Sequence, residues 1–169
     1  TGEGVINDED RTVIGNSIPR FTFGLNLGFE YKGFDFSCFF QGVGKADGYV
    51  TMEAIQPMGI NGARKEHYKE SFNPQDPKPG AYFPRILSSD YNYAYMSHWV
   101  QDASYIRLKN LQIGYSFKIK GLNQLRVYAS GENLFTATKY RTWDPETPVG
   151  ARGFYPNVAV YSMGVNLNF

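Results

Sequence analysis

The chain has 169 residues, 17 Lys and Arg against 16 Asp and Glu, and one cysteine, Cys38. The balanced charge argues against a nucleic-acid surface and a polybasic membrane patch, and the lone cysteine excludes a disulfide framework and a cysteine-based zinc site. Aromatic residues nevertheless make up 17% of a chain whose mean hydropathy is -0.41, so many aromatic side chains coexist with a polar overall composition.

The first two predicted strands cover residues 20–31 and 34–43. In residues 20–31 every odd position is apolar and every even position is not, which is the period-two pattern of a strand with one apolar face. Lys32 and Gly33 predict a tight reversal. Cys38 falls on the apolar face of the second strand and is expected to be an inert packing residue. The residues of that apolar face are Phe34, Phe36, Cys38 and Phe40, and Phe39 is an apolar exception on the opposite face.

Residues 44–102 interrupt the alternation with a long, proline-containing stretch. We predict a loop, because connections of this length in compact domains are usually functional or disordered. A short helix is predicted within residues 63–72 from their Arg, Lys and Glu content. The charged residues 66–70 are expected to form a solvated helix face.

Three more strands are predicted at residues 104–117, 124–135 and 157–169, joined by a short turn and by a long loop at 136–156. Ile106 and Leu108 are out of phase with the later apolar residues of their strand. A β-bulge near Asn110 would explain the change of phase.

Three features favour strands that cross a membrane. The strands are about 10–13 residues long, whereas soluble strands peak near 5–6 residues and membrane strands need about 9–11. Short and long connections alternate, as in outer-membrane barrels. If Phe169 ends a descending strand, both short turns fall in the periplasm and both long loops fall outside. Aromatic residues also gather at strand ends, as in an interfacial girdle: Phe21, Tyr31, Phe34, Phe117, Phe135 and Phe169.

Five strands cannot close a barrel, and an open sheet edge cannot lie in hydrocarbon. We therefore expect a C-terminal piece of a larger barrel, and the absence of a signal-peptide pattern agrees with that expectation. The alternatives are a soluble carbohydrate-binding β-sandwich module and a small outer-membrane adhesin or enzyme barrel.

The segment DRTVIGNSIPRFTFGLNLGFEYKGFDFSCFFQG (10–42) resembles a barrel segment of the SusC/RagA-type TonB-linked outer-membrane transporters of Bacteroidetes. The resemblance continues in family order through WVQDASYIRLKNLQIGYSF (99–117), LRVYASGENLF (125–135), YRTWDPE (140–146) and YPNVAVYSMGVNLNF (155–169). The last segment also resembles the signal read by the barrel-assembly machinery, which would comprise Tyr161, Met163, Val165, Leu167 and Phe169.

The resemblance implies an all-β fold in which about five antiparallel strands form a meander at the C-terminal end of a 22-stranded transmembrane barrel. Residues 1–19, 44–102 and 136–156 would be extracellular loops. It implies an importer of glycans or peptides in the outer membrane of a Gram-negative bacterium, without a cofactor. The implied partners are a SusD-like surface lipoprotein, TonB acting through an N-terminal plug, the barrel-assembly machinery and outer-membrane lipid.

No catalytic constellation is recognised, so we expect no enzyme. The two histidines, His67 and His98, lack metal-ligand partners at helical spacing. Asp144 and Glu146 are weak calcium candidates, because hard cations prefer oxygen ligands. The alternative is a turn around Pro145 in which Asp144 bonds to the backbone.

The densest aromatic run in a loop spans residues 91–99. It could stack on sugar rings or contact the lid. Alternatively, it could pack the loop on the barrel rim or act as an interface anchor, since Tyr and Trp suit half-wet positions. The candidate residues for substrate or lid contact are Tyr91, Tyr93, Tyr95, Trp99 and Trp143. The residues expected to face the lumen or the plug are Arg126, Tyr128, Ser130 and Glu132.

Overall fold

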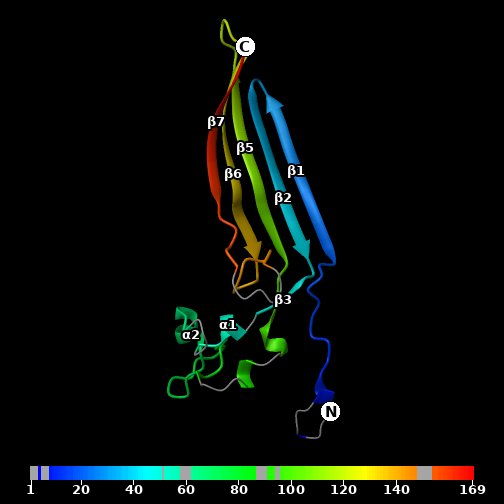
Figure 1. Cartoon of the computed structure of the whole chain (residues 1–169), viewed down its shortest axis with the longest axis vertical. Helices are drawn as coiled ribbons and strands as arrows, with labels where there is room; N and C mark the ends of the chain where they lie inside the picture. The colour runs from blue at the N-terminus through cyan, green and yellow to red at the C-terminus, as the bar shows by residue number, and fades with distance from the viewer. Residues whose placement is uncertain are drawn as a thin grey trace.

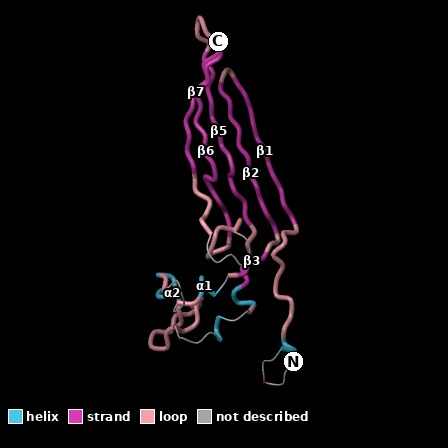
Figure 2. Tube along the Cα trace, viewed as in Figure 1, coloured by secondary structure: helices cyan, strands magenta, loops and turns pink. Residues whose placement is uncertain are grey.

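A long β-sheet forms one end of the molecule in the computed structural model, and a smaller loop part forms the other end (Figure 1). The structure describes residues 4, 8–50, 52–57, 62–86, 91–93, 96–147 and 154–169. The C-terminus lies at the far end of the sheet, whereas the N-terminus lies at the end that carries the loop part. Strands dominate the sheet end, and the helices lie away from it (Figure 2).

Five antiparallel strands form the sheet, and each pairs with the next long strand along the chain. This arrangement confirms the predicted meander. Most strand ends lie within one residue of the prediction, but one strand continues three residues further, to Thr138, and the last begins three residues later, at Val160. The strands, in spatial order, are β1 (Phe21–Tyr31), β2 (Phe34–Gly44), β5 (Tyr105–Phe117), β6 (Gln124–Thr138) and β7 (Val160–Asn168).

The turn between β1 and β2 is as tight as predicted. Lys32 has φ 49° and Gly33 has φ 88°. Two-residue hairpin turns with positive φ at both positions match the right-handed twist of the flanking strands. The turn therefore fixes the register in which Tyr31 pairs with Phe34.

The register places apolar residues of neighbouring strands opposite one another. Leu27 is paired with Cys38, and Phe29 with Phe36, whose ring centroid lies 5.2 Å away. The odd-numbered apolar side chains of β1 are between 48% and 65% exposed, whereas the small Cys38 is covered by its neighbours at 7%. This apolar side of the five strands, the outer face, leaves large apolar side chains exposed on neighbouring strands, which soluble monomers rarely do over a contiguous surface.

A β-bulge interrupts β5 at Lys109. Phe39 pairs with Asn110 while Phe40 pairs with Leu108, so Lys109 is left out of the pairing. An extra residue shifts the alternation by one position. The shift returns Leu108 to the outer face beside Phe40. The bulge lies next to the predicted position and accounts for the change of phase in the sequence.

The connection between β2 and β5 contains short elements. The predicted helix is confirmed as α2 (Lys65–Glu70), preceded by α1 (Met52–Ile55). The short strands β3 (Asp47–Tyr49) and β4 (Val100–Asp102) pair antiparallel and were not predicted. Within the described part of the chain, no helix has the length and apolar character that crossing a bilayer requires. The described residues also include 3₁₀ helices at Asp8–Asp10, Tyr91–Tyr93 and Ser97–Trp99.

The largest buried cluster lies in the loop part and not in the sheet. A single sheet buries little on either face, whereas the loop segments fold around their own aromatic residues. The cluster ties the start of the β2–β5 connection to its end and to the segment after β6. Its members are Ala46, Val50, Ala54, Ile55, Tyr93, Trp99, Ala103 and Tyr140.

Candidate functional site

The face opposite the outer face, the inner face, carries polar side chains, among them an ion pair that spans three strands. Arg126 on β6 donates to both carboxylate oxygens of Asp35 on β2, with Nε 2.9 Å from Oδ1. The pair passes over Gly114 on β5, where a Cβ would lie 2.5 Å from an Asp35 oxygen. The guanidinium also lies over the Tyr128 ring, 4.9 Å from its centroid. The missing side chain at Gly114 thus makes room for the pair.

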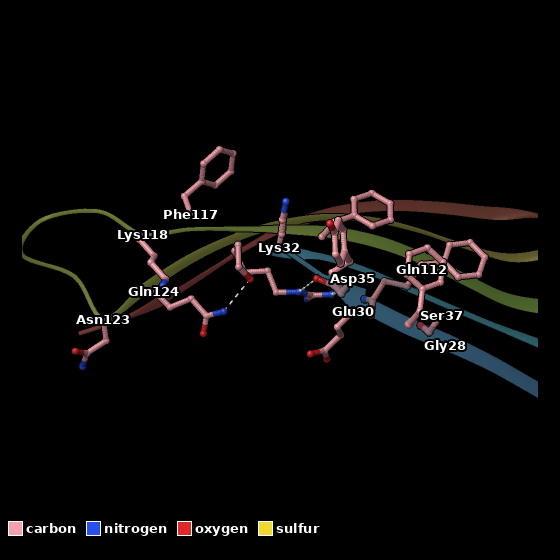
Figure 3. A pocket seen from close by; sticks show the side chains of 17 residues that line it. Gly28, Glu30, Lys32, Asp35, Ser37, Gln112, Phe117, Lys118, Asn123 and Gln124 are labelled. Atoms are coloured by element: carbon pink, nitrogen blue, oxygen red, sulfur yellow. Dashed lines mark hydrogen bonds and ion pairs between the residues drawn. The ribbon is translucent and has the colours of Figure 1, made fainter.

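A pocket at the turn end of the sheet surrounds this ion pair (Figure 3). In Figure 3, Phe117 projects from one side of the ribbons, whereas Glu30 and Gln124 project from the other. The Gln124 amide donates to the Ser116 hydroxyl at 2.7 Å. The two faces of the sheet therefore differ in chemistry down to the end of the strands.

Four charged residues form a second polar site at the loop end of the inner face, the charge cluster of Arg107, Lys109, Asp144 and Glu146. Arg107 Nη2 lies 2.8 Å from Asp144, and its Nη1 lies 3.2 Å from Glu146. Lys109 Nζ lies 2.8 Å from the same glutamate. The Arg107 side chain is only 2% exposed. Arg107 and Lys109 are two residues apart on β5, so their side chains lie on the same face and reach one pair of carboxylates.

The carboxylates considered as calcium ligands are engaged by protein groups. Asp144 Oδ1 accepts a hydrogen bond from the Glu146 backbone N–H at 2.9 Å, which is the bond of a turn around Pro145. The Asn157 amide and the Tyr105 hydroxyl donate to Glu146 at 2.6 and 3.0 Å. Among the residues that the structure describes, no three His, Cys, Asp or Glu side chains are grouped to hold a metal ion.

The candidate aromatic residues of the loop occupy different places. Tyr93 is 1% exposed and Trp99 is fully buried, with the two rings stacked at 6.2 Å. The indole N–H of Trp99 donates to the Asn92 carbonyl at 3.2 Å. These two rings pack in the interior of the loop part. Tyr95 and the side chain of Tyr91 lie outside the described residues.

Trp143 is half-buried and makes one of two aromatic–cation contacts in the loop part. The Arg64 guanidinium lies 5.1 Å from the Trp143 ring centroid, and the Arg141 guanidinium lies 4.9 Å from that of Tyr82. Arg141 also pairs with Glu70 at 2.7 Å. Burial raises the pKa of Tyr82. The role of Tyr82 was not predicted, because only the folded loop brings it to Arg141.

His67 departs from the expected solvated helix face. It is 1% exposed, and its Nδ1 accepts the Arg64 backbone N–H at 3.1 Å. Nε2 therefore carries the proton and donates to the Ala54 carbonyl at 3.2 Å. Burial lowers the pKa of His67, because it disfavours the imidazolium. Tyr68 of the same helix is 85% exposed, as a solvated helix face requires. The other histidine, His98, lies outside α2 and is exposed.

The predicted assembly residues of the last strand line the outer face. Val165 is paired with Val127, which is paired with Tyr115, so one apolar row crosses three strands. The predicted lumen residues lie on the inner face, where the Tyr128 ring covers Gly164. The residues of the assembly pattern are between 53% and 90% exposed: Tyr161, Met163, Val165, Leu167 and Phe169. The inner-face residues of β6 are Arg126, Tyr128, Ser130 and Glu132.

This arrangement suits a wall between two environments. One face is apolar and exposed, and the other is polar and carries ion pairs, as in strands that separate lipid from an aqueous lumen. The loop part lies at one end of the sheet.

Comparisons with known proteins agree with that geometry. The chain is 35% identical to "TonB-dependent receptor P3" of Formosa agariphila over 99% of the chain and 18% of that protein. It is 27% identical to "TonB-dependent receptor SusC" of Bacteroides thetaiotaomicron over 99% of the chain and 17% of that protein. No protein-family model matches.

The solved structures that match include a RagAB peptide importer in its "closed-closed" state, with a TM-score of 0.73 and 25% identity. That match covers 93% of this chain and 18% of the solved chain. The chain therefore spans less than a fifth of the length of these relatives. It belongs to the SusC/RagA family of TonB-linked outer-membrane proteins, and its five-stranded meander corresponds to a section of these relatives' chains.

Proposed function

We propose that these residues form the C-terminal wall strands and outer loops of a 22-stranded barrel that imports a nutrient across the outer membrane of a Gram-negative bacterium. The exposed outer face carries this proposal, because apolar rows across five paired strands need a lipid environment. The loop part would lie on the extracellular side, and the short turn at Lys32 and Gly33 on the periplasmic side. The role is structural and selective, without a chemical reaction.

The substrate is a glycan or a peptide, taken up with a SusD-like surface lipoprotein as lid and with energy supplied through TonB. The names of the relatives support this choice, since one is SusC and another belongs to a peptide importer. Among the candidate residues for contact with substrate or lid, Trp143 is half-buried, so part of its side chain is open to a ligand. The assembly machinery would read the apolar row of β7.

The alternative of a soluble carbohydrate-binding sandwich needs a second sheet to cover the apolar face. In the described residues the only other sheet is the short pair of β3 and β4. That pair lies in the loop part (Figure 1).

Uptake by cells tests the proposal. A strain that lacks the full-length transporter should lose uptake of one class of labelled oligosaccharides or peptides and regain it from a plasmid copy. The protein should fractionate with the outer membrane and require detergent for extraction. Wild-type uptake of every candidate by the deletion strain, or recovery as a soluble protein, would contradict the proposal.

A further inference from the structure

The segment after β6, residues 139–147, is the strap. It lies against the inner face at the loop end, where it borders a cavity shared with β2 and β5 that is lined by Gln41, Tyr105 and Thr147. Within the described residues, its one backbone–backbone hydrogen bond is internal, from Thr147 N–H to the Asp144 carbonyl at 2.9 Å. The strap is therefore not part of the β-ladder.

Side chains attach the strap to its surroundings. The charge cluster joins it to β5, and Tyr105 adds a hydrogen bond to Glu146 at 3.0 Å. On the loop side, Gln101 accepts the Arg141 N–H at 2.9 Å and donates to Thr142 at 3.3 Å. Tyr140 also packs in the buried cluster, so the start of the strap stays joined to the loop part. Residues 144–147 can leave β5 without breaking any hydrogen bond between strands.

The charge cluster is balanced but incompletely satisfied. Two cations face two carboxylates, and the buried Arg107 Nε has no hydrogen-bond partner among the described residues. A buried donor without a partner costs free energy, and water can satisfy it once the cover moves away. Loss of the carboxylates would leave Arg107 as an uncompensated buried charge, which displacement of the strap would hydrate.

We propose that the strap is a releasable closure: the charge cluster holds it against the inner face, and its release opens the bordering cavity toward the lumen. The first part of this proposal, that the charge cluster holds the strap against the inner face, is called the clamp and rests on the contacts alone. The further step, that the closed strap restricts passage of the solute, rests on the proposed transport function.

Hydrogen exchange of the full-length transporter in detergent tests the clamp. The double variant Asp144→Asn/Glu146→Gln should speed amide exchange in residues 139–147 by about tenfold or more, with β5 and β6 unchanged. Arg141→Gln is the matched control, because it removes the exposed pair with Glu70 from the same segment and should leave the strap protected. Unchanged strap exchange, or equal acceleration in β5 and β6, would overturn the clamp.

If the double variant fails to fold, Lys109→Gln gives the same test in a milder form. It removes one partner of Glu146 at a partly exposed position and should speed strap exchange by about twofold to fivefold. No change with this variant would overturn the clamp as well.

A reversible cross-link tests the closure. Gln41→Cys and Thr147→Cys line the same cavity, and a reducible thiol cross-linker should lower uptake by about tenfold, with recovery on reduction. Each single cysteine variant serves as control. Full uptake by the cross-linked protein would overturn the restriction of passage. Failure of the unmodified protein to import any candidate would refute the transport function and leave the exchange result intact.

Discussion

Two glycines on the inner face matter because they have no side chain. Gly114 lets the Asp35–Arg126 pair cross β5, and Gly164 lets the Tyr128 ring lie flat on β7. Both glycines occupy positions where a side chain would meet a partner from a neighbouring strand. The ion pair and the ring thus depend on residues that make no polar contact themselves.

The first prediction concerns Gly114. Gly114→Val should destabilise the barrel by about 1–3 kcal/mol, because the added side chain pushes Asp35 and Arg126 apart. Asp35→Asn should have a similar effect, because it removes the negative charge of the pair. The double variant should add little to either single change, since both remove the same interaction. The free energy of unfolding of the full-length protein in lipid vesicles checks this, with Ser130→Val on the same face as control. Additive losses would contradict the coupling.

The second prediction concerns pH and His67. Its pKa is lowered in the folded loop by burial, so the unfolded loop binds more protons as the pH falls below about 6.5. Loop stability should therefore be complete at neutral pH and decline on acidification below that value. Amide exchange around residues 62–72, measured from pH 7.5 to pH 5 after correction for intrinsic exchange rates, checks this.

His67→Gln should abolish that pH dependence, whereas His98→Gln, at an exposed position, should retain it. The same acid sensitivity in the His67 variant would show that another group titrates.

At the scale of elements, the sequence predicted the five strands and the bulge because each leaves a local trace. Alternation follows from the strand geometry, and the bulge appears as a change of phase between Leu108 and Leu111. The β3 and β4 strands are too short to leave such a trace. The charge cluster joins Arg107 and Asp144, which lie far apart in the sequence, so only the strand pairing and the fold of the strap reveal it.

No local pattern in the sequence predicts which side chains of the loop part are buried. Trp99 and Tyr93 look alike as exposed platforms or packed rings until the loop is folded, and the structure places both inside. His67 was assigned to a charged helix face because its neighbours are charged, yet it is the residue of α2 that points into the loop part.

The third prediction concerns the bulge. Deletion of Lys109 should turn residues 105–108 over, placing Arg107 on the lipid side and Leu108 on the inner face. A basic residue on the lipid face costs up to about 2–4 kcal/mol, and the charge cluster would be lost in addition. The deletion should abolish the heat-modifiable folded form on semi-native gels. Lys109→Gln, which keeps the extra residue, should fold, and a folded deletion variant would contradict this role of the bulge.

At the scale of the whole molecule, the high aromatic content and the polar overall composition belong to different surfaces. The aromatic residues of the strands lie mainly on the outer face, and several of those in the loop part, among them Tyr93 and Trp99, pack its interior. Polar residues occupy the inner face. The same sequence therefore combines an apolar outer face, a polar inner face and a self-packed loop part.

The claim that the outer face contacts lipid is tested most directly by measuring which side chains of β1 are accessible to lipid and which to water, in the full-length protein in a bilayer. Spin labels placed one at a time along residues 22–29 should show high collision rates with oxygen at the odd positions and low rates at the even positions. A water-soluble nickel reagent should not reach the odd positions. The alternation of Phe23, Leu25, Leu27 and Phe29 against their neighbours predicts a period of two, and equal nickel access at odd and even positions would contradict a lipid-facing wall.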